Sequence, residues 1–496
     1  MPSSEGPSRR EFLGTVLRST LVGTAAAMGT GPAFGQVAAP KNVRVGTKSV
    51  IAPRDLTWLG AWQTAATFNR YSRPSLGLRY VGGERRFLFH EWRASGGGIG
   101  DIVEMRAPAN PAFYTGTDMA SAPAMVETRR WAGADWSQAW MSDSTLFPQA
   151  SELGSLYWDE IHGVLWFCIY GPYATGRNTP TWGAVELLDT VKTGAYCNVG
   201  SIYGPWHYRS TSLQGNLFTY ARQVNQWIVP VPPSGQALIG GSRFLIGAGH
   251  TGYNGDAPWG PNLHALADLS PRMPNPVPLL RALAEYSPES PLTRRGCRRD
   301  GTHYHPSFSG SGPYQNEVIN GEGTWFGGCS MVKGICWVDT GTKHGIVKFG
   351  EECQGGVGYW HANPKGDEPY PNERDPTLPT GIANSPKATE HYLWLRIFNP
   401  DHLAEVWAGR RVPYADTYSG KPGMRLAYEV NMRENITNGA NIPILYSKEG
   451  DALQPRAAGP STDFGGAVWD PKAGQAVWMQ YRTAPSGVVL CFFSVT

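Results

Sequence analysis

The stretch Ser155–Tyr173, SLYWDEIHGVLWFCIYGPY, decides the fold. Two apolar, aromatic-rich runs flank a polar turn that ends at Gly163. These residue types fit a pleated, half-buried surface, so the stretch predicts a β-hairpin.

The same design recurs along the chain. Residues 466–481 repeat it, with Trp469-Asp470 before a turn and Trp478 after it, and residues 78–90 and 330–339 hold weaker copies. A hairpin that cannot bury its own faces must pack against other copies, which predicts radially packed sheets. We therefore expect an all-β chain that forms a single β-propeller. At about 40 to 65 residues per blade it would have seven blades, with six or eight as alternatives.

The composition agrees with an all-β protein that forms one domain. The chain has 61 Gly, 40 Pro, 19 Trp and 22 Tyr, and only 17% of its residues are charged, which is typical of many turns and few long amphipathic helices. A net charge of +3 gives no reason to expect a nucleic-acid partner. No Pro/Ser-rich linker divides the repeats, so we predict one propeller domain over residues 36–496 and a monomer.

The first 35 residues are predicted to be a signal peptide. Arg9-Arg10 is followed by Phe12-Leu13, then by an apolar segment and a small-residue site that ends at Gly35. This order is typical of a twin-arginine (Tat) signal. No later run is long and apolar enough to span a membrane. We expect a periplasmic or secreted protein with no membrane association.

The seven cysteines are an odd number, so at least one is expected to stay unpaired. Cys168 and Cys491 lie in apolar strand runs and are interpreted as small core residues. Cys329 and Cys336 are the closest pair for a disulfide. No cofactor is expected, and a structural Zn or Ca site remains an alternative, because ligands could converge only through the fold.

A predicted strand that ends in His90 is followed by a Gly-rich loop at residues 96–100 and by an apolar-Glu strand before Pro108. Further motifs lie at residues 204–218, 240–249, 260–266, 392–406 and in the terminal hairpin. Together they resemble the motifs of secreted bacterial propeller proteins related to the propeller polysaccharide lyases, the ulvan lyases and rhamnose-glucuronate lyases. The resemblance implies a seven-bladed carbohydrate-active propeller that cleaves uronic-acid glycans by β-elimination.

Such a reaction needs a base, an acid and a group that neutralises the uronate carboxylate. His90, at a strand end, is the candidate base, although a histidine that packs in the core would give the same sequence pattern. Tyr170 and Tyr173 are candidate acids, Arg177 is a candidate carboxylate clamp, and His250 lies in a Gly-rich loop. We expect His90 to line a polar pocket at the channel mouth with at least one of the others. The partner would be an acidic polysaccharide or oligosaccharide.

Two alternatives stay open. A glycosidase would need two carboxylates, but Asp159 and Asp470 lie at hairpin turns, where aspartate is an ordinary turn former. A non-catalytic glycan-binding or interaction propeller would use exposed tryptophans, for which Trp182, Trp206 and Trp259 are candidates.

Overall fold

The structure is a computed structural model of the whole chain. The parts that it describes belong to one compact unit, residues 40–496. They are residues 48–64, 75–91, 100–116, 121–137, 152–170, 182–206, 208–209, 226–249, 262–275, 277–278, 281–284, 318–319, 325–326, 331–358, 387–413, 420–424, 426–431, 462–483 and 486–496.

Antiparallel sheets dominate the fold, as the sequence predicts. Sheet 1 contains β3 (Leu76–Val81), β4 (Glu84–His90), β5 (Ile102–Arg106) and β6 (Val126–Trp131). Sheet 2 contains β7 (Glu152–Asp159), β8 (Val164–Tyr170), β9 (Trp182–Thr193) and β10 (Tyr196–Trp206). One parallel pairing, Tyr196 with Arg130, joins β10 to β6 and makes one 8-stranded sheet of the two.

Three further sheets follow in chain order. Sheet 3 contains β12 (Trp227–Pro230), β13 (Phe244–Gly247), β14 (Leu263–Leu266) and β16 (Arg281–Ala284). Sheet 4 contains β19 (Met331–Asp339), β20 (Lys343–Gly358), β21 (Lys387–Phe398) and β22 (Leu426–Asn431), and β1 (Ser49–Val50) pairs with the start of β20. Sheet 5 contains β23 (Thr462–Asp470), β24 (Gln475–Thr483), β25 (Ser486–Val495) and β2 (Leu56–Gln63).

The remaining elements are short. They are the strand pairs β11 (Tyr208–Arg209) with β15 (Val277–Pro278) and β17 (Val318–Ile319) with β18 (Trp325–Phe326), the 3-10 helices η1 (Pro53–Asp55) and η5 (Ala237–Ile239), and the α-helices α2 (Gly133–Trp136), α4 (Pro233–Gln236) and α5 (Pro400–Trp407). Asn399 caps α5 by accepting a hydrogen bond from the amide of Asp401. Among the described residues, no helix has the length and apolarity needed to cross a membrane.

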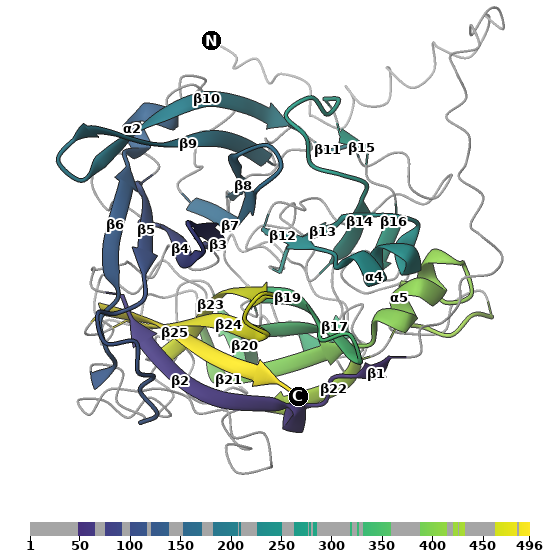
Figure 1. Cartoon of the computed structure of the whole chain (residues 1–496). Helices are drawn as coiled ribbons and strands as arrows, with labels where there is room; N and C mark the ends of the chain where they lie inside the picture. Colours follow the sequence, from purple (N-terminus) through teal and green to yellow (C-terminus); the bar gives the residue numbers. More distant parts are fainter. Residues whose placement is uncertain are drawn as a thin grey trace, which may run out of the picture. The chain divides into compact units, whose positions relative to one another are not determined.

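The first strand of each sheet lies innermost, and these five strands contact one another in a closed cycle. β3 contacts β7, β7 contacts β12, β12 contacts β19, β19 contacts β23, and β23 contacts β3 again. Their labels lie together in the middle of Figure 1, with the other strands of each sheet outside them. This is the arrangement of a β-propeller.

Apolar side chains fill the space between successive sheets. Each of the five buried clusters draws its members from two neighbouring sheets: 1 and 2, 2 and 3, 3 and 4, 4 and 5, and 5 and 1. Between sheets 4 and 5, Trp478 stacks on Phe493 at a centroid distance of 3.5 Å and lies 4.1 Å from Phe349. Burial at all five interfaces is the main force that holds the sheets together.

The two ends of the propeller domain meet in sheet 5. β2 pairs antiparallel with β25 from Leu56–Val495 to Gln63–Val489, and β25 pairs with β24 of the terminal hairpin. Trp478 of that hairpin is fully buried. An N-terminal strand therefore completes the last sheet, so backbone pairing ties the two ends of the domain together where the ring closes.

The predicted count of seven blades is not confirmed, because the described strands form five sheets that pack in a cycle. The estimate allowed about 40 to 65 residues per blade, loops included, whereas sheet 4 alone runs from Met331 to Asn431.

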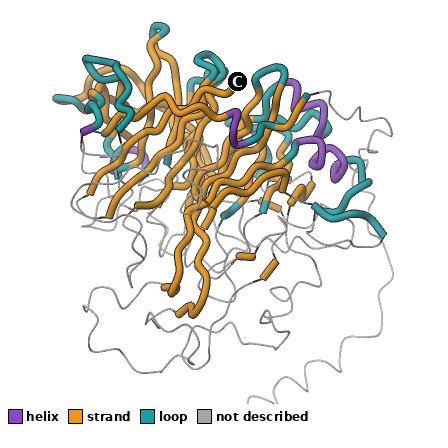
Figure 2. Tube along the Cα trace, turned by 90° about the horizontal axis from the view of Figure 1, so that it is seen from below, coloured by secondary structure: helices purple, strands orange, loops and turns teal. Residues whose placement is uncertain are grey.

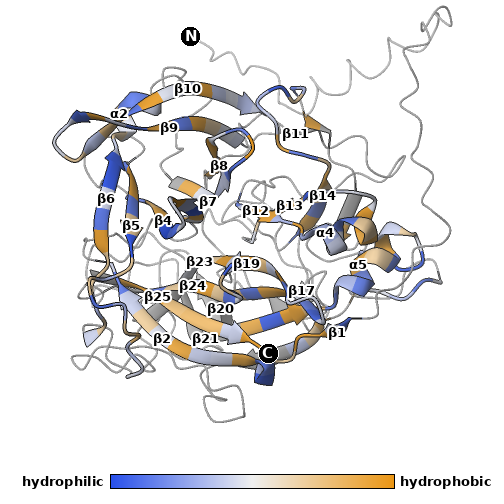
Figure 3. Cartoon of the chain, in the orientation of Figure 1, coloured by the Kyte–Doolittle hydropathy of each residue, from blue (hydrophilic) through white to orange (hydrophobic). Residues whose placement is uncertain are grey.

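The described hairpin turns gather at one end of the strands, as Figure 2 shows. Polar residues concentrate on particular outer strands, and β6 is largely hydrophilic in Figure 3. Of the two charged regions described below, one lies at that end of the strands and the other includes β6.

Candidate functional site

A cavity of about 710 Å³ lies where the innermost strands end, and we call it the axial pocket. Every one of β3, β7, β12, β19 and β23 contributes to its lining. Its apolar floor includes Leu78, Leu156, Ile228, Ile335 and Ala467. Because all five sheets build this pocket, it is a natural place for a ligand.

Hairpin turns border the pocket, and aspartates shape them. The Asp159 carboxylate accepts hydrogen bonds from the amides of Ile161 and His162, and Asp470 accepts from those of Lys472 and Ala473. These are the turn-forming roles that the sequence predicts for both residues.

Aromatic side chains form part of the pocket rim. Tyr80, Tyr157, Trp158 and Trp469 line the opening, and all four are partly exposed. The Tyr80 hydroxyl donates to the Asp470 carboxylate at 2.8 Å, which fixes its ring. Lys472 Nζ lies 4.1 Å from the centre of that ring. The rim therefore combines partly exposed aromatic rings with polar groups.

The two rim tyrosines are held in their protonated form. Burial, and then the neighbouring Asp470 carboxylate, raises the pKa of Tyr80 above its usual range. Burial, followed by the charge of Asp159, raises the pKa of Tyr157 to about 12. Both phenols are hydrogen-bond donors at neutral pH, and neither has the lowered pKa that would favour a catalytic base.

One wall of the pocket rim carries a three-residue polar cluster. Lys48 Nζ lies 2.6 Å from Asp339 Oδ1 and donates to the Ser234 hydroxyl at 2.9 Å, and that hydroxyl donates to Asp339 Oδ2. Burial acts to raise the pKa of Asp339, but hydrogen bonds from Lys48, Ser234 and the Gly341 amide outweigh it and lower the pKa. The cluster joins the chain just before β1 to α4 and to the end of β19.

The opposite wall carries a looser pair. Lys472 Nζ lies 3.6 Å from Glu160 Oε1, and these side chains are 57% and 60% exposed. An exposed pair at this distance is weak and can exchange partners with a ligand.

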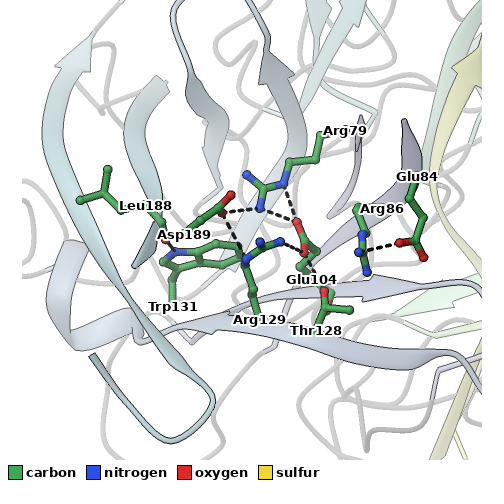
Figure 4. A network of polar contacts seen from close by, with 9 residues as sticks. All are labelled: Arg79, Glu84, Arg86, Glu104, Thr128, Arg129, Trp131, Leu188 and Asp189. Carbon is green, nitrogen blue, oxygen red and sulfur yellow. Dashed lines mark hydrogen bonds and ion pairs between the residues drawn. The ribbon is translucent and has the colours of Figure 1, made fainter. Parts of the chain in front are cut away.

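A second charged region lies on sheets 1 and 2, and we call it the Glu104 network (Figure 4). The buried Glu104 carboxylate pairs with Arg79 and accepts hydrogen bonds from Arg129 at 2.9 Å and Thr128 at 2.6 Å. Asp189 of β9 lies 3.2 Å from both arginines. Every oxygen of Glu104 has a partner, so this network holds elements together rather than facing a ligand.

The structure places His90 inside sheet 1. Its side chain is fully buried, its Nε2 accepts a hydrogen bond from the Gly100 amide at 3.0 Å, and it does not line the axial pocket. Burial lowers its pKa to about 3, although the charge of Asp101 acts to raise it. His90 is therefore a neutral side chain whose acceptor nitrogen is already engaged, which is the environment of a structural histidine.

The other predicted site residues fall outside what the structure describes. Tyr170 ends β8, as predicted for a strand end, but its side chain is not among those described. Tyr173, Arg177 and His250 lie outside the described residues. Their roles stay predictions.

Two of the three tryptophans proposed to stack on sugars are buried. Trp182 is fully buried and Trp206 is nearly so, because both belong to the core between sheets 2 and 3. Trp259 lies outside the described residues. The pocket rim instead uses Trp158 and Trp469. Their recurrence directly before a turn aspartate was the sequence signal that could have found them.

Cysteines and metals add little to the site. Cys168 and Cys491 are fully buried in the core, as predicted. Cys336 is a buried free thiol in the structure, and Cys329, the partner suggested for a disulfide, lies outside the described residues. Within the described ranges, no group of three or more His, Cys, Asp or Glu side chains could hold a metal ion.

Comparisons with known proteins give only remote similarities. The sequence matches no protein family and no curated protein. A glycosyl hydrolase from Bacteroides ovatus aligns over 92% of this chain and 92% of its own, with 9% identity and a TM-score of 0.33. A second structure was reported for the GH130 family of mannoside phosphorylases, which contains glycoside hydrolases that target β-1,2 mannosidic linkages in Candida mannan. It aligns over 90% of this chain and 96% of its own, with 8% identity and a TM-score of 0.37. At these TM-scores the similarities carry no argument about this chain's activity.

Proposed function

We propose that this protein is an exported carbohydrate-active β-propeller whose axial pocket binds an acidic saccharide. The observation that carries the proposal is the pocket itself, with partly exposed Tyr80, Tyr157, Trp158 and Trp469 beside hydrogen-bonding side chains on the ring axis. Sugar rings have apolar faces that stack on aromatic side chains and hydroxyls that need polar partners.

The acidic character of the ligand rests on Lys472. Its ammonium group is largely exposed, and its partner Glu160 is a weak surface contact at 3.6 Å. A ligand carboxylate can take the place of Glu160 at little cost, because exposed ion pairs contribute little free energy. Lys48, by contrast, is already held by Asp339 and Ser234.

The pocket chemistry supports binding more directly than catalysis. The rim tyrosines are fixed as donors by raised pKa values, and His90 is buried away from the pocket. The sharper hypothesis, a lyase that cleaves uronic-acid glycans by β-elimination, rests on Tyr170, Tyr173, Arg177 and His250 and on the resemblance described above.

A glycan panel tests the proposal. We expect acidic oligosaccharides to bind with a measurable heat of binding, and Trp158→Ala to weaken that binding at least tenfold. Trp58→Ala is the matched control, because Trp58 is also partly buried but does not line the pocket. Equal losses from both variants, or no binding across the panel, would refute the proposal. New ultraviolet absorbance from an unsaturated uronate would identify the protein as a lyase.

Export is tested separately. Replacing Arg9 and Arg10 by lysine should leave unprocessed precursor in the cytoplasm, since the Tat signal depends on this arginine pair. Normal export of the double variant would contradict the assignment.

A further inference from the structure

The axial pocket divides into a polar rim and an apolar floor. The charged and phenolic groups stand at the strand ends, whereas deeper positions on the five inner strands hold Leu78, Leu156, Ile228, Ile335 and Ala467. Apolar side chains from five separate strands therefore meet at one place on the axis.

The few polar side chains on the floor are unavailable or neutral. The Ser155 hydroxyl donates to the backbone oxygen of Ile228 at 3.4 Å. Burial raises the pKa of the Cys336 thiol to about 12, so this side chain is uncharged. A sugar hydroxyl placed against these side chains would lose water without gaining a side-chain partner, which is unfavourable.

We infer that the natural ligand is a glycan that carries an apolar substituent, an acyl or aryl group, and that this substituent occupies the floor while the sugar lies at the rim. A volume of about 710 Å³ is in the range that holds a drug-sized ligand. Apolar contact with Leu78, Leu156 and Ile228 provides the driving force for the substituent, because burying apolar surface is favourable in proportion to its area. The inference rests on the proposed saccharide site and defines its ligand class.

Methyl, octyl and phenyl β-D-glucuronides test the apolar-substituent site separately from the saccharide site, since they share one acidic sugar and differ in the apolar group. Binding is followed by calorimetry below the concentration at which the octyl compound forms micelles. We expect the octyl or the phenyl compound to bind at least tenfold more tightly than the methyl compound, and the better of the two identifies the substituent as acyl-like or aryl-like. Equal affinity for all three overturns the inference and leaves the saccharide site standing. Failure of all three to bind contradicts the saccharide site as well.

Two variants locate the apolar group. Ala467→Phe fills the floor and should remove the preference for the apolar compound. Leu78→Ser, at a partly exposed floor position, should reduce the preference severalfold even if the larger residue at 467 impairs folding. Val191→Phe adds the same side chain at a position on β9 that is 68% exposed and outside the pocket, and it should leave the preference unchanged. A preference that survives both floor variants overturns the assigned location.

Discussion

The Glu104 network and the pocket rim are both clusters of charged side chains, yet their surroundings give them opposite roles. Glu104 is fully buried and both of its oxygens have partners, so a change there leaves an unpaired charge inside the protein. Lys472 and Glu160 at the rim are more than half exposed and meet at 3.6 Å. Burial, rather than the number of charges, therefore separates the groups that stabilise this propeller from those that can meet a ligand.

The largest effect is expected from Glu104→Gln. Arg79 is 3% exposed, and removing its principal counter-charge should lower the free energy of unfolding by about 3–5 kcal/mol, as for other broken buried pairs. The midpoint of urea unfolding measures this. Glu84→Gln is the control, because Glu84 is 45% exposed and pairs with Arg86 at 2.7 Å, and its loss should cost about 1 kcal/mol or less. Equal costs for the two variants would abolish the distinction between buried and exposed charge.

His90 should behave like the buried network rather than like the rim. His90→Ala leaves the Gly100 amide without its acceptor and should cost about 2–3 kcal/mol of stability. The pKa of His90 is about 3 in the folded protein against 6.5 for an ordinary histidine, so as the pH falls from 6.5 towards 3 the unfolded chain gains a proton that the folded chain does not. Stability should therefore fall by about 1.4 kcal/mol per pH unit across that window.

His90→Gln, which keeps an acceptor but cannot titrate, should lose most of this slope. An unchanged slope, or a stable His90→Ala protein without glycan-dependent function, would return His90 to the list of candidate catalytic residues.

Asp339→Asn should give a smaller change that depends on pH. The pKa of Asp339 is lowered in the fold, so its contribution is complete above the ordinary value of 3.8 and is lost as the pH falls through the lower folded value. We expect a loss of about 1 kcal/mol or less at pH 7 and no difference from the original protein in strong acid. Thermal unfolding at several pH values measures it, and a loss that grows in acid would contradict the pairing with Lys48.

The smallest effect on stability is expected from Lys472→Ala, within about 0.5 kcal/mol, because the side chain is largely exposed. The affinity of the Lys472→Ala protein for an acidic sugar should nevertheless fall severalfold, while its affinity for the matching neutral sugar stays the same. Calorimetry with a glucuronide and its glucoside makes the comparison. Equal losses for both sugars would show that Lys472 does not recognise the carboxylate.

Much of the fold could be predicted because three of the five inner hairpins carry a local signal. The pairs that begin at β3, β7 and β23 each have an apolar run and a tight turn, as the repeats at residues 78–90, 155–173 and 466–481 indicate. Residues 330–339, expected to be a weaker copy of the hairpin, instead hold the single strand β19, and the turn to β20 follows them. The pair β12 and β13 has α4 and η5 in its connection instead, so no hairpin pattern marks it. The repeat pattern therefore could not predict the number of sheets.

The site was harder to predict because the closed ring assembles it. Lys48, Ser234 and Asp339 lie far apart in sequence and meet only when sheets 3 and 4 pack together. His90 stood out because it ends a strand, but a strand end does not reveal burial. Trp158 and Trp469 carried a usable signal, since each directly precedes a turn aspartate.

The most direct test of the account is a crystal structure of the protein grown with the tightest-binding glucuronide. We expect ligand density in the axial pocket, with the sugar against Trp158 or Trp469, its carboxylate near Lys472 and its substituent on Leu156 and Ile228. Ligand density bound elsewhere, with the axial pocket empty, would contradict it.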